Sequence, residues 1–295
     1  MDFSKAIELQ TASSTYININ SLTSSSPNAV LSGYMVEGIQ YTGSTVSGYV
    51  DGMAQRDGVD TDIAVLGPRQ VQLIVQVYGS TGADFYDKLD TLNSALQPYP
   101  SFATSDDGFR QLRFTQPTIS YAALSASGIP MYMKLRPTSL PGYALNNDRV
   151  TPLKAGKGVA AKVNVAMFAK DPRKIHQTTS SGSLGVSTTT TSSTAVTNNG
   201  NYFAYPTMII TSSRTVAQTA TISSSLWTCV VSVPASTTVT IDSIYRTVKV
   251  GTTLRMDLLL SGTTSTPYLV SGSNSLTVSA LTSTTVTYSF QEAWI

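Results

Sequence analysis

The chain has 295 residues, of which 41% are hydrophobic, so it is long enough for two domains and can bury a core. Charged residues make up only 12% of it, and a formal net charge of +2 gives no electrostatic reason to expect nucleic acid or an anionic membrane as a partner. A single cysteine excludes an intrachain disulfide. With no 18-residue apolar run and no signal-peptide pattern at the N-terminus, we expect no membrane span and synthesis in the cytoplasm without standard export.

The first 60 residues contain only short strand-like pieces. Residues 6–10 and 16–20 hold few large apolar side chains, which predicts that they pair with the sheet edge of a neighbouring copy instead of forming a core of their own. After them, alternating apolar residues predict half-buried strands over 71–77, 131–135 and 163–167.

One helix is predicted, over about residues 84–97. Phe85, Leu89, Leu92 and Leu96 recur at spacings of three and four and form one apolar stripe. Acidic residues near the start suit the helix dipole, and a proline directly after the segment ends it. One helix among many strands indicates a sheet domain with a helix packed on it.

A change in composition divides the chain near residue 177. Residues 178–201 are almost entirely Ser, Thr, Gly and Asn, which is typical of a flexible linker. Because Thr also favours strands, residues 186–196 alternatively form the first strand of the next domain. The sequence therefore predicts a domain over 1–177, a linker or first strand over 178–201, and a second domain over 202–295.

The last third of the chain reads as one short strand after another. β-Branched and aromatic residues alternate and are interrupted by Gly, Pro and Ser, over 205–210, 239–242, 245–248, 272–276 and 286–290, with Trp294 near the end. This pattern predicts a β-sandwich or barrel. With almost no residues that could do chemistry, the domain is expected to serve as a surface.

Groups that could carry catalysis are few and scattered. His176 is the only histidine, so a Ser-His-Asp or Cys-His arrangement would need it, and beside the expected linker it is predicted to lie on the surface. Cys229 lies in a strand pattern and is predicted to be buried. Zinc would need a Cys/His cluster, which the chain lacks. The glutamates Glu8, Glu37 and Glu292 are far apart in sequence and nominate no glycosidase pair.

Three further motifs are weak. Asp57-Gly58-Val59-Asp60-Thr61-Asp62 lacks the glycine and glutamate positions of a calcium loop and is predicted to be a polar turn. Gly156-Lys157-Gly158 lacks the rest of a phosphate-binding loop; with Arg149, Lys154 and Lys162 it indicates a solvated basic loop or, alternatively, a DNA-facing patch. Trp227 and Trp294 could supply a sugar platform, but their strand contexts favour burial. No catalytic, cofactor-binding or metal-binding residue is therefore assigned, and no enzyme activity is expected.

The order of these features resembles the distal tail protein family of long-tailed bacteriophages. Residues 69–71 with Tyr78-Gly79 resemble its first core strand, and 85–98 resemble its helix. Phe168-Ala169-Lys170-Asp171-Pro172 is similar to its strand-end signature, and Asn199-Gly200-Asn201 with Pro206–Ile210 resembles the entry to its second domain. Residues 238–242, 246–248 and 269–276, with a Gly-x-Asn turn, resemble the later strands.

The resemblance implies an all-β protein with one helix, made of an N-terminal ring-forming β-sandwich-like domain and a C-terminal galectin-like β-sandwich. It implies a structural virion protein at the tail tip: a homo-hexameric ring, or two such rings stacked back to back, that joins the tail tube protein to the tail-tip or baseplate hub proteins. DNA would pass through its channel without sequence-specific binding. The alternatives are another tail component, such as a tube or terminator protein, and a carbohydrate-binding module or glycan hydrolase.

Overall fold

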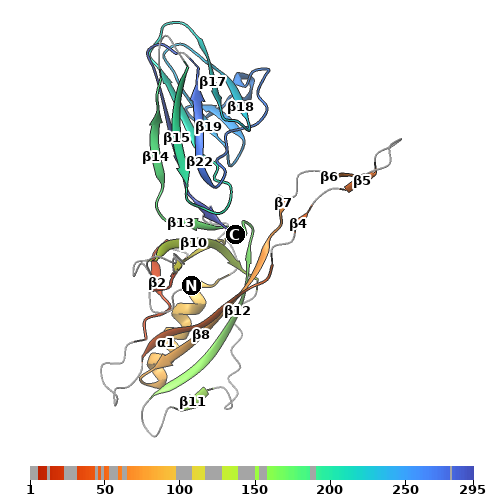
Figure 1. Ribbon diagram of the computed structural model, residues 1–295. Coiled ribbons are helices and arrows are strands. Elements are labelled where there is room, and N and C mark those ends of the chain that lie inside the picture. The colour runs from red at the N-terminus through yellow and green to blue at the C-terminus, as the bar shows by residue number, and fades with distance from the viewer. Residues whose placement is uncertain are drawn as a thin grey trace. The chain divides into compact units, whose positions relative to one another are not determined.

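The chain folds into two compact units, Met1–Arg173 and Lys174–Ile295. The computed structural model describes residues 6–11, 14–22, 32–43, 46–47, 50–52, 59–61, 65–97, 108–116, 128–138, 150–152, 158–186, 191–279 and 281–295. Antiparallel strands build both units, and the single α-helix of the described residues belongs to unit 1 (Figure 1). The predicted fold class, all-β with one helix, is confirmed. No helix in the described ranges is long and apolar enough to cross a membrane.

Unit 1 is organised around one antiparallel sheet with the strand order β2-β1-β9-β10-β12-β8-β3, and a short strand β11 pairs with β12. The long strands β8 and β12 pair along eleven residues, from Val159↔Gly79 to Ala169↔Arg69. The bounds are β1 (Glu8–Gln10), β2 (Tyr16–Asn18), β3 (Gly33–Tyr41), β8 (Arg69–Gly79), β9 (Arg110–Gln116), β10 (Ile129–Pro137), β11 (Val150–Pro152) and β12 (Val159–Ala169).

Period-2 alternation gives this sheet its buried face, as predicted. Val71, Leu73, Val75 and Val77 of β8, Val163, Val165 and Met167 of β12, and Met131, Met133 and Leu135 of β10 are all buried. The helix α1 (Gly82–Ala95) packs on β8 and β12, with Phe85, Leu89 and Leu92 buried. Because a Cβ on Gly79 would lie 2.4 Å from the backbone nitrogen of Phe85, only glycine lets the strand pass this close to the helix.

The N-terminal pieces correct an expectation. β1 pairs with β2 and with β9 of its own chain, and Ile7, Leu9 and Ile19 are fully buried. These residues are therefore part of the core of unit 1, contrary to the expectation. Because β2 is the end strand of the sheet, pairing of this edge with a neighbouring copy stays a prediction. The asparagine after β2, Asn20, accepts a hydrogen bond from the backbone N–H of Val36 at 3.3 Å, so the two ends of the sheet approach each other.

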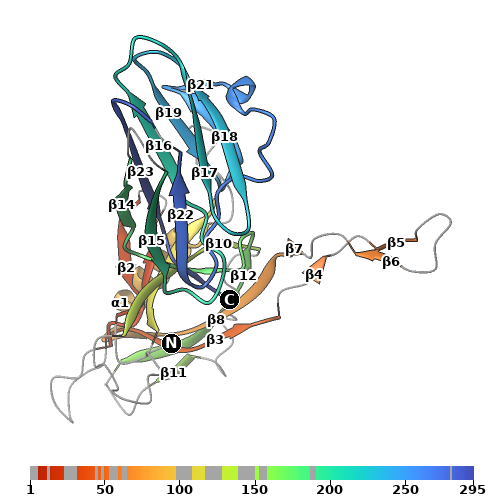
Figure 2. The ribbon, with the colours of Figure 1, turned by 45° about the horizontal axis from the view of Figure 1, so that its top comes forward.

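Unit 2 is a sandwich of two antiparallel sheets (Figure 2). One sheet has the order β14-β23-β16-β19-β20-β21 and the other β15-β22-β17-β18, while β13 pairs with β24. The bounds are β13 (Lys174–His176), β14 (Ser180–Leu184), β15 (Ser192–Asn198), β16 (Thr207–Ser212), β17 (Gln218–Ser223), β18 (Thr228–Val233), β19 (Thr238–Asp242), β20 (Thr247–Val250), β21 (Thr253–Leu254), β22 (Gly272–Val278), β23 (Thr284–Phe290) and β24 (Ala293–Trp294), with a 3-10 helix η1 (Met256–Leu258).

The inward residues of both sheets form one core. Met208 and Ile210 of β16 and Val239 and Ile241 of β19 face Ala220, Ile222, Cys229, Val231 and Leu276 of the other sheet, and all are fully buried. A hydrogen-bonded asparagine closes the Gly-x-Asn turn: the side chain of Asn274 accepts from the N–H of Val270 at 2.9 Å and donates to the carbonyl of the same residue at 2.9 Å.

The Ser/Thr-rich segment supplies strands to both sheets of unit 2. β14 pairs with β23 along five residues and β15 with β22 along seven. The two compact units divide at Arg173–Lys174, and β13 follows immediately. The strand expected over 245–248 begins later, because Tyr245 lies in the turn between β19 and β20 and is exposed.

Candidate interaction surfaces

The side chains considered as catalytic candidates are buried or packed against other side chains. Burial raises the pKa of the fully buried Cys229 thiol to about 11, which keeps it protonated and a poor nucleophile. His176, in β13, is half-buried and not at the surface as expected: its ring meets Trp294 edge-on at 6.1 Å, and its Nδ1 atom is enclosed. Within the described ranges, no three His, Cys, Asp or Glu side chains are grouped so that they could hold a metal ion.

The three glutamates lie in different places. Glu8 stands opposite Arg113 in the register of β1 and β9. Glu37, at the β-bulge of β3, pairs with Lys162 at 2.6 Å and accepts from the side chain of Gln76. Glu292, in unit 2, is buried and accepts from the side-chain amide of Asn199 at 2.6 Å. The carboxylates of Glu37 and Glu292 support local structure, and the three glutamates do not converge on one site.

The two tryptophans belong to the interior, as predicted. Trp227 is buried and its indole N–H donates to the carbonyl of Tyr268 at 2.7 Å, while Trp294 is buried beside His176. Neither forms an exposed platform for a sugar. Of the weak motifs, the structure describes Gly158, Lys162 and the strand β6 (Val59–Thr61), whereas residues 57–58, 62, 149 and 153–157 lie outside the described residues.

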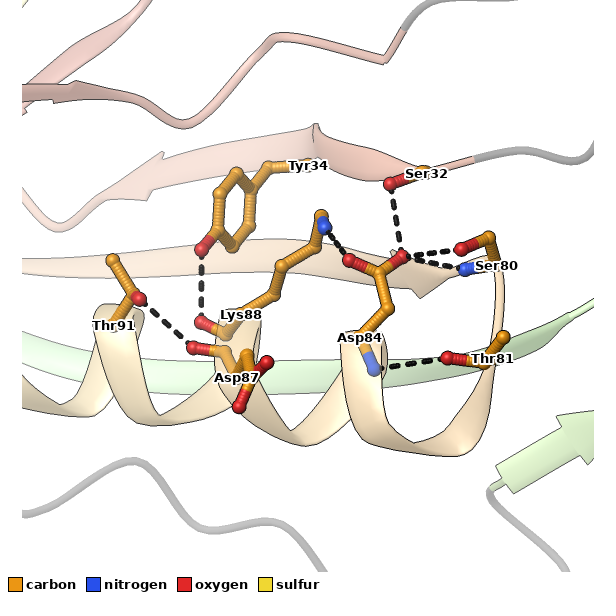
Figure 3. Close-up of polar contacts among 8 residues, drawn as sticks. All are labelled: Ser32, Tyr34, Ser80, Thr81, Asp84, Asp87, Lys88 and Thr91. Atoms are coloured by element: carbon orange, nitrogen blue, oxygen red, sulfur yellow. Dashed lines mark hydrogen bonds and ion pairs between the residues drawn. The ribbon is translucent and has the colours of Figure 1, made fainter.

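A polar cluster fixes α1 against β3 and β8 (Figure 3). The N-cap Thr81 accepts from the N–H of Asp84 at 3.1 Å. The Asp84 carboxylate accepts from the N–H of Ser80 at 2.7 Å and from the hydroxyl of Ser32 at 3.0 Å, and it pairs with Lys88. The Tyr34 hydroxyl of β3 donates to the backbone carbonyl of Lys88 at 2.8 Å. The helix is therefore tied to two strands at its N-terminal end, which makes this side of unit 1 a fixed support.

A two-stranded ribbon extends from the other end of β3 and β8, where β3 ends and β8 begins. The pairing of β3 with β8 reaches Tyr41↔Val71 and continues through the N–H of Thr42, which donates to the carbonyl of Gln70 at 3.1 Å. It then resumes as β4 (Val46–Ser47) with β7 (Val65–Leu66), and as β5 (Val50–Gly52) with β6. Figure 1 shows these strand pairs following one another beyond the end of β3 and β8.

Among the described residues, the ribbon strands pair only with each other. β4–β7 and β5–β6 each form a two-stranded sheet, whereas β3 and β8 belong to the main sheet of unit 1. Isolated two-stranded ribbons are marginally stable in water, and both of their edges present backbone donors and acceptors. A second polypeptide that covered the ribbon would satisfy these groups, so the ribbon is the clearest candidate interface of unit 1.

A hollow lies at the root of the ribbon. It has a volume of about 520 Å³ and is lined by exposed and buried residues at the ends of β3, β8 and β12, together with Thr138. The side chains of Gln40, Gln70 and Gln72 are exposed there, and Phe168 is half-buried. The hollow contains amides that both donate and accept hydrogen bonds and has no charged lining residue.

In unit 2, hydroxyl groups close one strand edge. The hydroxyls of Thr263 and Thr264 accept from the backbone N–H groups of Val230 and Thr228, at 3.0 and 2.9 Å. The backbone of the same loop bonds this edge through the N–H of Leu260, which donates to the carbonyl of Val230 at 2.9 Å. Along β18, side-chain hydroxyls thus accept the hydrogen bonds that the backbone carbonyls of a further strand would otherwise accept.

Comparisons with known proteins show which fold this is. The Dit protein of SPP1, described as a paradigm of the hub adsorption apparatus in phages that infect Gram-positive bacteria, is similar at 14% sequence identity and a TM-score of 0.57. The match covers 99% of this chain and 100% of that one. Two structures of the phage p2 baseplate in its activated conformation, with Sr and with Ca, are 8% and 10% identical with TM-scores of 0.41 and 0.39, too low to add to the argument. No protein-family profile and no curated protein sequence matches.

The match to SPP1 Dit spans both units and leaves almost no residue of either chain outside it. The resemblance that the sequence shows to distal tail proteins is thus confirmed for the fold. The chain has the two-unit, all-β fold of a Dit protein along its entire length.

Proposed function

We propose that this chain is a structural protein of a phage tail tip, a distal tail adaptor. In this proposal six copies form a ring that joins the tail tube to the tail-tip or baseplate proteins, and DNA passes through the central channel. The observation that carries the proposal is the end-to-end match to the fold of the SPP1 Dit protein, described as part of a hub adsorption apparatus. A tube or terminator protein would not need a complete second sandwich, and unit 2 is one.

The ribbon supports assembly into a ring. A heterologous contact repeated between copies closes into a ring when its rotation is a simple fraction of a full turn. A ribbon that leaves its own sheet and has both edges uncovered is suited to such a contact, because it can lie on the next copy while its own root receives the ribbon of the previous one. The hollow beside the root offers neutral amides to a backbone lying there.

Chemistry within the described residues also favours a structural role. In this chain the cysteine is buried, the histidine ring lies beside a tryptophan, and the glutamates lie in different places and form no carboxylate pair. We therefore propose that the chain has no catalytic step. Reproducible turnover of a glycan, ester or peptide, abolished by a single substitution such as His176→Ala, would contradict this part of the proposal.

Two measurements test the function. The mass of the full-length protein, measured by light scattering at several concentrations, is expected to reach six times the 31.3 kDa of one chain, or twelve times if two rings stack. Antibody-labelled virions viewed by electron microscopy are expected to carry the label at the tail tip. A label on the capsid or along the tail shaft would refute the placement.

A further inference from the structure

Four large apolar side chains are exposed together at one edge of unit 2. Ile244 is 58% exposed, Tyr245 74%, Leu254 56% and Met256 42%. The first two lie in the turn between β19 and β20, Leu254 is in the edge strand β21, and Met256 begins η1. We call these four residues the apolar edge patch. Contiguous exposed apolar surface of this kind marks interaction sites on soluble proteins.

The backbone holds the patch in a fixed arrangement. The carboxylate of Asp242 accepts from the N–H groups of Ile244 and Tyr245, at 3.1 and 3.2 Å, and so defines the turn. Leu254 stands opposite Lys249 in the register of β20 and β21. Next to it, the sulfur of Met256 lies 3.4 Å from the backbone nitrogen of Val248. A preorganised surface loses little conformational entropy when a partner binds.

These side chains are not displaced core residues. The same elements send Ile241, Val248 and Leu258 into the core, where all three are buried. The patch residues therefore occupy the outward positions of elements whose inward positions are already filled. Tyrosine and methionine are enriched at the centres of protein–protein interfaces, and exposed tyrosine is a frequent hot spot.

The charges around the patch indicate what kind of partner fits. Arg246 is exposed and Lys249 half-exposed, and neither has an ion-pair partner among the described residues. Arg255 is neutralised by Asp257, with its Nη2 2.8 Å from a carboxylate oxygen. The Asp242 carboxylate is engaged by the N–H groups of the turn, so the charged rim side chains without a bound partner are both cations and the rim is weakly positive. A two-fold contact between identical patches would bring two positive rims together, which is unfavourable, whereas a partner with carboxylates would complement them.

We propose that the apolar edge patch docks a different protein, whose contact surface presents apolar side chains bordered by aspartate or glutamate. This inference deepens the proposed function and rests on it, because the partner is a neighbouring tail-tip protein and the test uses assembled particles. Tyr245 is the central anchor, and Arg246 and Lys249 set the orientation of the partner.

Photo-crosslinking in assembled particles tests the proposal. The full-length chain, with p-benzoylphenylalanine in place of Tyr245, is produced in cells infected by the phage that encodes it, and purified particles are irradiated. We expect a heteromeric product whose crosslinked peptide from the partner contains Asp or Glu near the site of attachment. The matched control carries the same amino acid in place of Leu226, which is 58% exposed outside the patch, and is expected to give at least tenfold less product.

The charged rim is tested in the same particles. Adding Arg246→Glu and Lys249→Glu is expected to lower the yield at position 245 at least tenfold, while Arg246→Lys leaves it unchanged. A product made of two copies of this chain, equal yields at 245 and 226, no product, or a yield indifferent to the charge reversal would each overturn the proposal. Antibody labelling tests the location of the chain in the virion separately. A chain located away from the tail tip refutes the proposed function, whereas the crosslinking result tests the docking role of the patch.

Discussion

The two units differ in what pairs with the backbone N–H and C=O groups at the edges of their sheets. Unit 2 pairs all its long strands into two sheets, and at one of the remaining sheet edges the hydroxyls of Thr263 and Thr264 bond to β18. Unit 1 extends β3 and β8 into a ribbon whose strands pair only with each other. A sheet that closes its own edges can fold alone, whereas an uncovered ribbon calls for another chain. We therefore expect the proposed ring assembly to depend on unit 1, and unit 2 to fold by itself.

Deleting the ribbon should have the largest effect on assembly. If the deletion left assembly unchanged, the contrast between the two units would not hold. We expect the chain with residues 44–66 deleted, and Gly43 joined to Gly67, to remain folded but monomeric at every concentration at which the full chain forms rings. The main sheet keeps its pairing of β8 with β12 and its buried core, so circular dichroism should change little. The mass is measured by light scattering. Rings of undiminished size would show that the ribbon is not the contact.

The fragment 174–295 is the matched comparison. It contains both sheets and the complete core of unit 2, and we expect it to fold cooperatively and to stay monomeric. Its thermal transition should coincide with one of two transitions of the full chain. A fragment that forms hexamers would move the assembly contact into unit 2.

Core truncation should separate the stabilities of the two units. Trp227→Ala removes a buried ring and a hydrogen bond to Tyr268 in unit 2, and we expect it to lower the free energy of unfolding of that unit by about 3–5 kcal/mol. Leu89→Ala, on the buried side of α1, should cost about 2–5 kcal/mol in unit 1. Urea unfolding followed by circular dichroism measures both. If each substitution shifts both transitions equally, the units do not fold independently.

The sequence predicts those features of the fold and the candidate sites that depend on residues close together in the chain. The apolar alternation at Val71–Val77 and the stripe containing Phe85 and Leu89 predicted β8 and α1, because a side-chain period fixes the element that it needs. The helix runs over 82–95 and not 84–97, since Thr81 caps it earlier.

Pairing partners could not be read in the same way. The three-residue strands β1 and β2 hold too few positions to show which sheet they join, and only the structure shows β9 beside β1. The Ser/Thr-rich segment has the composition of a linker, yet β22 and β23 give it neighbours. Among the candidate site residues, burial of Cys229 and of both tryptophans followed from their strand contexts. The partly enclosed position of His176 did not, because it depends on Trp294, more than a hundred residues away.

The thiol of Cys229 offers a smaller test within unit 2. Because burial raises its pKa to about 11, we expect iodoacetamide at pH 8 to label it only when unit 2 unfolds. Cys229→Ser places a hydroxyl among apolar side chains and should cost about 1–3 kcal/mol, whereas Cys229→Ala, which adds no polar atom, should cost less. Labelling is followed by mass spectrometry in increasing urea. Rapid labelling of the native protein would show that this core opens easily.

The smallest expected effect is a pH dependence confined to unit 1. The hydrogen bond from the Lys88 ammonium, and next the N–H of Ser80, hold the pKa of Asp84 well below its usual range. A carboxyl group whose pKa is depressed on folding stabilises the folded state above its unfolded pKa of about 3.9, and that contribution is lost as the pH falls toward the folded value. Asp84→Asn should therefore destabilise unit 1 at pH 7 by about 1 kcal/mol, since the group is a quarter exposed, and by less at pH 3. Asp87→Asn, on the same helix but outside these carboxylate bonds, is the control. Urea midpoints of unit 1 at the two pH values measure the difference, and a gap between the two variants that widens on acidification would reverse the sign and contradict the assignment.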